Sequence, residues 1–110
     1  MKVIDLITEL DLKVFTPEMG METCITGGYV SDLLSDVIGN ASEGQAWITL
    51  QNHMNVIAIA SLKDLPCVIF VKGIVPPPEV VNKAIEEGIA LLGSNDRTFE
   101  LAGKIYQMLK

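Results

Sequence analysis

The sequence predicts an α/β fold, a three-layer α/β/α sandwich around a mainly parallel sheet of about four to five strands. Short apolar, strand-like segments alternate with amphipathic helical segments, a pattern that produces βαβ crossovers and parallel strand pairing. Only 5% of the residues are aromatic and 49% are hydrophobic, so the core must be mostly aliphatic, as in strands covered on both faces. The 110 residues fit one domain spanning residues 1–110.

Hydrophobic periodicity and turn residues divide the N-terminal half of the chain. In order, the predicted elements are a helix over 3–10, an extended piece over 12–15, a strand over 23–26, a helix through 33–38 and a strand over 46–50. Gly27 and Gly28 are expected to close the strand over 23–26. Ser31 or Asp32 can cap the helix that follows, because their side chains accept hydrogen bonds from free N–H groups.

The C-terminal half continues the alternation. Its predicted elements are a helix capped by Asn52 and running to about 63, a strand over 67–71, a helix over 78–87, a strand over 89–92 and a helix from about 96 to 109. Pro78 suits a first helical turn and Gly88 suits the position just after a helix. The segment 67–71 has no polar alternation, which predicts a strand buried on both faces.

Charge and hydropathy disfavour several classes of partner. The formal net charge of −6 opposes binding to nucleic acids and to anionic membrane surfaces. No apolar run approaches the roughly 18 residues of a membrane span. The N-terminus turns acidic at Asp5, too early for a signal peptide. We therefore expect a cytoplasmic protein.

The cysteines and the single histidine do not form a metal-binding pattern. Cys24 and Cys67 lie in strand-like runs and are expected to be buried, reduced thiols. Together with His53 they lack the spacing of a zinc ligand set, so no metal or cofactor is expected. Trp47 is favoured as a core residue, with an aromatic platform for an interface as the alternative.

Ligands of open parallel sheets bind outside the carboxyl ends of the strands. Four loops are predicted there, and three of them lead into helix N-termini, whose free N–H groups favour anions. The candidate ligand-binding residues in these loops are Thr26, Gly27, Gly28, Tyr29, Asn52, His53, Lys72 and Gly73. A loop at 93–95 completes the group.

Each of these features also has a purely structural interpretation. Gly27 and Gly28 could let a ligand approach the backbone closely or could serve a tight turn. They form neither a P-loop nor a Rossmann fingerprint. His53 could contact a phosphate or shuttle a proton, although an ordinary surface histidine is favoured. Lys72 could pair with an anion or lie in solvent.

The run Thr26-Gly27-Gly28-Tyr29-Val30-Ser31-Asp32 resembles the DRTGG domain, and so does the stretch 41–49 that follows. DRTGG domains are similar to the N-terminal domain of HPr kinase/phosphorylase and, more distantly, to the uridine-nucleotide-binding domain of Mur ligases. The resemblance implies an α/β/α sandwich. It does not imply kinase activity, because HPr kinase keeps its P-loop in a separate domain. The arginine that the family has just before Thr-Gly-Gly is missing here.

Three functions follow from these features. The leading hypothesis is a non-catalytic regulatory or ligand-sensing domain that binds a small anionic metabolite or nucleotide. The alternative is a homo-oligomeric, dimeric assembly module that docks on a larger enzyme, which a contiguous apolar patch at Trp47, Tyr29 or the final helix would support. An enzyme using His53 is disfavoured, since no nucleophile–base pair is recognisable.

Overall fold

The computed structural model describes all residues 1–110 and contains one five-stranded sheet in the order β1-β5-β4-β3-β2. The strands are β1 (Lys13–Val14), β2 (Gly27–Val30), β3 (Gln45–Thr49), β4 (Cys67–Phe70) and β5 (Ala90–Gly93). Strands β2 to β5 pair in parallel, and β1 pairs antiparallel with β5 at one edge. The predicted α/β class with a mainly parallel sheet is confirmed.

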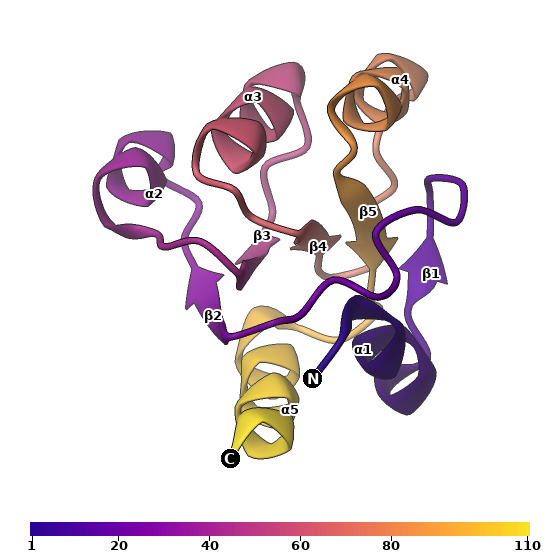
Figure 1. Cartoon of the computed structure of the whole chain (residues 1–110), viewed down its shortest axis with the longest axis vertical. Helices are drawn as coiled ribbons and strands as arrows, with labels where there is room; N and C mark the ends of the chain where they lie inside the picture. The colour runs from indigo at the N-terminus through magenta and orange to yellow at the C-terminus, as the bar shows by residue number, and fades with distance from the viewer.

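Five helices cover the two faces of the sheet (Figure 1). They are α1 (Val3–Leu10), α2 (Leu34–Asn40), α3 (Met54–Leu62), α4 (Pro78–Glu87) and α5 (Thr98–Leu109). Figure 1 shows α2, α3 and α4 on one face and α1 and α5 on the other, which is the predicted three-layer arrangement. None of these helices is long and apolar enough to cross a membrane.

The core consists of two clusters, one on each face of the sheet. Trp47, Val68 and Phe70 belong to the cluster under α2, α3 and α4. Ala46, Ile48 and Ile69 belong to the cluster on the side of α1 and α5. The alternation arises because successive strand side chains point to opposite faces. All four residues of β4 are buried, as the absence of polar alternation predicts.

Helix α4 begins and ends where the sequence predicts. The side-chain caps predicted for α2 and α3 are wrong. Pro78 occupies its first turn, and Gly88 follows it with a left-handed φ of 72°, a conformation that costs glycine little. His53, rather than Asn52, is the N-cap residue of α3, and no side chain caps that helix. Helix α2 starts at Leu34 without a capping side chain, because Asp32 bonds to β3 instead.

The position of the second strand is the main correction to the sequence prediction. Gly27 and Gly28 do not close a strand over 23–26; they are the first residues of β2 and pair with Gln45 and Ala46. The segment before them bonds to the N-terminus, where the Ile25 N–H donates to the Met1 carbonyl (2.7 Å). This segment lies outside the sheet and has only one isolated bridge, between Lys2 and Cys24.

The two cysteines therefore have different environments. Cys24 is exposed, contrary to prediction, because its segment runs along the surface. Cys67 is buried in β4, as predicted, and burial raises the pKa of its thiol to about 12. The Cys67 thiol is therefore protonated and unreactive near neutral pH.

Candidate ligand-binding site

The carboxyl ends of β3 and β4 bring four of the eight predicted site residues to one edge of the sheet. Asn52 and His53 follow β3, and Lys72 and Gly73 follow β4. The two strands are in register up to the pair Thr49 and Phe70, so the loops leave the sheet side by side. We call Asn52, His53, Lys72 and Gly73 the strand-end site.

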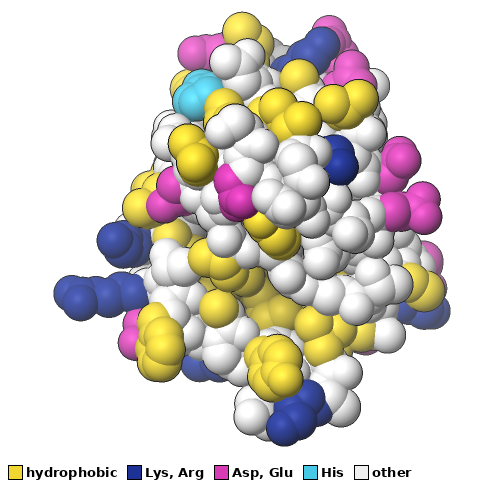
Figure 2. All heavy atoms as spheres, turned by 90° about the vertical axis from the view of Figure 1, so that its left-hand side faces the viewer, with side chains coloured by type: hydrophobic (Ala, Val, Ile, Leu, Met, Phe, Trp, Pro, Cys, Tyr) yellow, Lys and Arg dark blue, Asp and Glu magenta, His cyan; other side chains and the backbone are white.

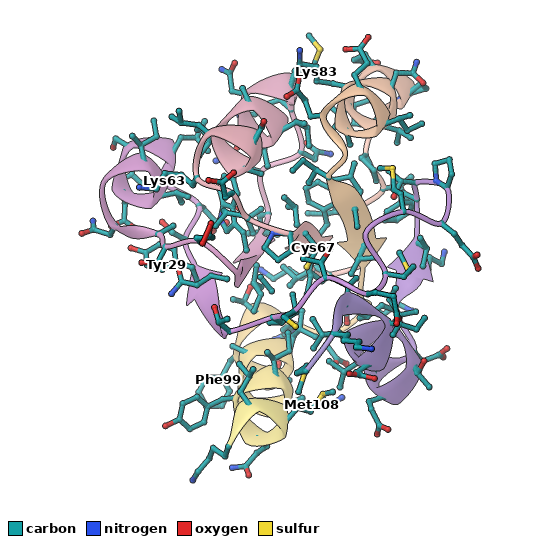
Figure 3. The ribbon with its side chains drawn as sticks, in the orientation of Figure 1. Tyr29, Lys63, Cys67, Lys83, Phe99 and Met108 are labelled. Carbon is teal, nitrogen blue, oxygen red and sulfur yellow. The ribbon has the colours of Figure 1, made fainter.

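The other four predicted residues do not lie at this edge. Thr26 lies at the amino end of β2, where its hydroxyl donates to the Glu43 carbonyl (3.3 Å). Gly27 begins β2, and Gly28 lines a groove beside α5. Tyr29 lies on the α2 side of the sheet (Figure 3), where its hydroxyl donates to Asp36 (2.9 Å). These residues lie at the start of β2 or within it, rather than after a strand, because β2 begins four residues later than the predicted strand over 23–26.

The loop after β4 is held in a defined conformation. Lys72 and Gly73 both have left-handed backbones, with φ of 59° and 72°. Their N–H groups donate to the carbonyls of Asp96 (2.8 Å) and Ser94 (2.9 Å), in the loop after β5. A left-handed lysine costs conformational energy, which these two hydrogen bonds offset. The backbone at Lys72 is therefore fixed beside the end of β5.

Two acidic side chains near this edge, Asp32 and Asp96, are already engaged, whereas Asp11, which lines a small hollow with Gly73, forms no ion pair. The Asp32 carboxylate accepts hydrogen bonds from the Thr49 hydroxyl (2.8 Å) and the Leu50 N–H (2.7 Å). Asp96 forms an ion pair with Lys104 (2.7 Å). The sequence prediction treated Asp32 only as a helix cap and missed its bond to Thr49. A polar residue at the end of an otherwise buried strand was the signal that Thr49 needs a partner.

The free groups of the strand-end site itself are cationic or are hydrogen-bond donors. Lys72 is exposed and takes part in none of the four ion pairs of the structure. Helix α3 has no side-chain cap and no acidic residue in its first turn, so its first N–H groups keep their partial positive charge. His53 is exposed at that same helix end. The strand-end site is thus locally suited to an anion on a chain of net charge −6.

Metal binding has no comparable support in the structure. No group of three or more histidine, cysteine, aspartate or glutamate side chains lies close enough together to hold a metal ion. The donors of the strand-end site are backbone N–H groups, an ammonium and an imidazole, and the first two repel cations.

On the α2 side of β2, Asp36 is surrounded by polar groups. The pKa of Asp36 is lowered by the nearby hydroxyls of Ser31 and Tyr29 and by the amide of Asn40, which stabilise the carboxylate. A lowered folded-state pKa adds stability above the ordinary value of 3.8, and this stability is lost as the pH falls through the folded-state pKa. The contact therefore contributes at neutral pH and not in strong acid.

We expect Tyr29→Phe to be less stable than the wild type at neutral pH, with a difference that shrinks as the pH falls below 3.8. The reason is that the substitution removes one donor to Asp36. Urea denaturation of both proteins across the acid range measures this. Tyr106→Phe is the control, because Tyr106 is exposed on α5. A wild-type advantage that stays constant with pH would contradict the expected role of Asp36.

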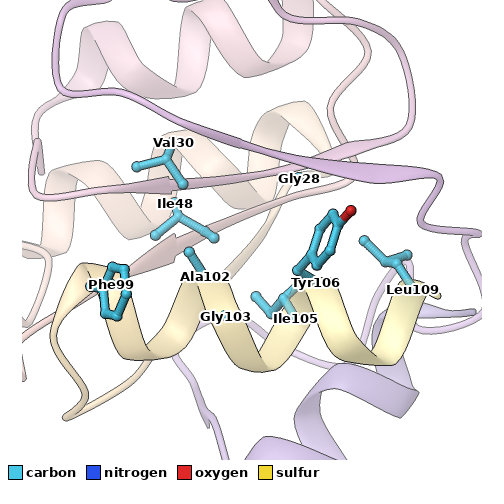
Figure 4. Close-up of a pocket in the computed structure, with 9 residues that line it drawn as sticks. All are labelled: Gly28, Val30, Ile48, Phe99, Ala102, Gly103, Ile105, Tyr106 and Leu109. Atoms are coloured by element: carbon cyan, nitrogen blue, oxygen red, sulfur yellow. The ribbon is translucent and has the colours of Figure 1, made fainter.

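An apolar hollow lies between β2 and α5 on the face shown in Figure 2. Its volume is about 360 Å³, and seven of the nine residues that line it are hydrophobic. The lining residues, drawn in Figure 4, are Gly28, Val30, Ile48, Phe99, Ala102, Gly103, Ile105, Tyr106 and Leu109. We call this hollow the α5 groove. It is the kind of apolar surface at the final helix that the assembly hypothesis predicts.

Trp47 does not contribute to any such surface. Its side chain is fully buried and its indole N–H donates to the Ser31 carbonyl (2.9 Å). The predicted core role of Trp47 is confirmed, and the alternative of an exposed interface platform is wrong.

Comparison with known proteins identifies the family. A family model described as HPr Serine kinase N terminus matches residues 49–109, more than half of the chain. The chain belongs to this family. The match contains the whole strand-end site and the whole of α5, and it begins after β2. The resemblance to the HPr kinase N-terminal domain is confirmed.

Two curated relatives are the HPr kinase/phosphorylases of Streptococcus equi subsp. zooepidemicus (strain MGCS10565) and Streptococcus equi subsp. equi (strain 4047). Each is 40% identical over 62 residues, which cover 56% of this chain and 20% of the relative. The HPr kinase N-terminus domain described here thus spans about a fifth of the length of these enzymes.

A solved structure shares the whole fold. It contains the CBS and DRTGG domains of the regulatory region of Clostridium perfringens pyrophosphatase, complexed with the activator diadenosine tetraphosphate. The TM-score is 0.73 at 14% sequence identity, and the alignment covers 96% of this chain and 46% of the other. At this identity the likeness concerns the fold, and the predicted relationship to DRTGG domains is confirmed at that level.

Proposed function

We propose that this HPr kinase N-terminus domain is a non-catalytic regulatory domain that binds a small anionic metabolite, of the nucleotide class, at the strand-end site. One observation carries the proposal: Lys72 and the uncapped end of α3 are free, whereas Asp32 and Asp96 beside them are engaged. Anions bind at helix N-termini because free N–H groups and the helix dipole both favour negative charge.

Two further findings support a regulatory role. The family model corresponds to the N terminus of HPr kinase, and the sequence resemblance implies that the P-loop of that enzyme lies elsewhere. The pyrophosphatase region with the same fold is a regulatory region, and its crystal contained a dinucleotide activator. A phosphate-rich ligand suits the free donors of the strand-end site.

The proposal predicts that Lys72→Asn lowers affinity for phosphate-bearing ligands about tenfold, the loss expected when one charge-assisted hydrogen bond worth about 1.4 kcal/mol disappears. Asparagine removes the charge and tolerates the left-handed backbone at this position. Isothermal titration of the 110-residue chain with inorganic phosphate, AMP, ATP and diadenosine tetraphosphate measures the affinity.

Lys63→Asn is the matched control for this experiment. Lys63 lies at the other end of α3 and forms no ion pair, so its replacement changes the net charge equally without touching the strand-end site. Equal loss of affinity in both variants would mean that only the overall charge matters. Failure of the wild type to bind any of the four probes would overturn the proposal.

A further inference from the structure

The two edges of the sheet differ in how they are protected. At one edge β1 is only two residues long and contains Lys13, and short charged strands discourage further pairing. At the other edge β2 is four residues long, Gly27–Val30, and contains no charged residue and no proline. Outside its pairing with β3, the backbone of β2 forms no hydrogen bond. Its outward N–H and C=O groups are therefore available to another strand.

The α5 groove runs beside this open edge. Phe99 lies near Val30 at one end and Tyr106 lies near Gly28 at the other (Figure 4). The side chains of Phe99 and Tyr106 are 85% and 64% exposed. No charged side chain lines the groove, although the chain carries a net charge of −6. Two copies that met here would bring apolar surfaces together without opposing carboxylates.

Gly103 lies at the middle of α5, within the groove. Glycine inside a helix costs about 1 kcal/mol relative to alanine. A Cβ at position 103 would have no neighbouring atom within 4 Å, so nothing inside the chain requires glycine there. The open space above Gly103 allows another backbone or side chain to approach α5 closely.

From these three features we propose that two copies of this chain form a dimer by antiparallel pairing of their β2 strands, with the two α5 helices packed against each other at the groove. This inference is independent of the proposed ligand site. A two-fold axis perpendicular to the sheet would pair β2 with its copy and keep both α5 helices on the same face. The sheets would join into one ten-stranded sheet, and the exposed β2 edge of each copy would be paired.

The positions of the apolar residues fit this symmetry. Helix α5 follows β5, which is parallel to β2, so α5 runs opposite to β2 and its midpoint lies near the middle of that strand. The axis would pass close to Gly103 of both copies. In the resulting antiparallel helix pair, Phe99 of one copy lies opposite Tyr106 of the other, and each aromatic ring can enter the facing groove.

The available area is sufficient for a dimer. Aromatic side chains hold roughly 150–250 Å² each, so the exposed parts of Phe99 and Tyr106 in two copies provide roughly 450–750 Å². Val30, which is 48% exposed and lines the groove, adds to this patch. Strand pairing adds backbone area to this total, so the interface can exceed the roughly 1,000 Å² that a specific interface needs.

Sedimentation equilibrium of the 110-residue chain and of Gly103→Arg tests the proposal. The wild type is expected to be a dimer at micromolar concentration, and Gly103→Arg is expected to raise the dimer dissociation constant at least about thirtyfold, or about 2 kcal/mol, by placing a long charged side chain at the interface centre. Circular dichroism should show that Gly103→Arg is folded, since position 103 has free space within its own chain.

Two further variants make the test specific. Phe99→Asp should also give monomers, and it serves if Gly103→Arg does not fold. Ala58→Arg is the control, because Ala58 is an exposed small residue on α3, on the other side of the sheet, and this variant should stay dimeric. A monomeric wild type, or a dimer that survives both Gly103→Arg and Phe99→Asp, would overturn the proposal.

Discussion

Trp47→Ala is expected to lower the free energy of unfolding by about 3–5 kcal/mol, the range for truncation of a large buried aromatic residue. Trp47 is fully buried in the cluster under α2, α3 and α4. The substitution leaves a cavity beside β3 and removes the only hydrogen bond from a side chain to the Ser31 carbonyl. Since domains of this size are stable by only about 5–15 kcal/mol, this loss removes a large part of the total stability.

Urea denaturation followed by far-ultraviolet circular dichroism measures this loss without relying on tryptophan fluorescence. Trp47→Phe separates packing from hydrogen bonding, because it fills much of the space but cannot donate to Ser31. We expect it to lie between the wild type and Trp47→Ala. If Trp47→Ala unfolds at nearly the wild-type urea concentration, the neighbouring helices must be able to close the cavity.

The central part of the fold was predictable from local sequence patterns. Strand β4 is a short, continuous apolar run between Pro66 and Gly73, and its length and these flanking residues favour a strand buried on both faces. Helix α4 combines an amphipathic face with Pro78 at its start and Gly88 at its end. In these segments composition, turn residues and periodicity all favour the same structure, so tertiary contacts had nothing to override.

The edge strand β2 was not predictable in the same way. Its sequence, Gly27-Gly28-Tyr29-Val30, is rich in glycine and half exposed, whereas the preceding residues have the higher strand propensity. Pairing with β3 decides the register, and that information lies about 20 residues away in the sequence. The consequence for function is large, because a shift of four residues moves Thr26 and Gly27 from the carboxyl end of the sheet toward its amino end.

The candidate site was predictable to the extent that it depends on strands β3 and β4. Asn52, His53, Lys72 and Gly73 lie at one edge of the sheet because both strands were correctly placed and parallel strands end at the same edge. The engagement of the nearby carboxylates was not predictable, since it depends on side-chain contacts between segments far apart in the sequence. The bond between Asp32 and Thr49 joins residues that are 17 positions apart.

That bond leads to the second large effect: Asp32→Ala is expected to destabilise the domain by about 2–3 kcal/mol. The Asp32 carboxylate receives two short hydrogen bonds at the end of β3, from the Thr49 hydroxyl (2.8 Å) and the Leu50 N–H (2.7 Å). Thr49 is only 1% exposed, so water cannot readily replace the lost acceptor. The Thr49 oxygen would still accept a hydrogen bond from the Gln51 N–H (3.1 Å), but its O–H would have no acceptor, and a buried donor without an acceptor costs more than the net value of an ordinary hydrogen bond.

A double-mutant cycle with Thr49→Val isolates the contact between the two side chains. If the Thr49 hydroxyl without its acceptor causes much of the loss, Asp32→Ala should cost less in the Thr49→Val background, with a coupling of about 0.5–3 kcal/mol. Glu18→Ala, which removes an equal charge from an exposed loop, is the control and should change stability little. Additive effects of the two substitutions would show that the Leu50 N–H, rather than Thr49, accounts for the role of Asp32 in joining β2 to β3.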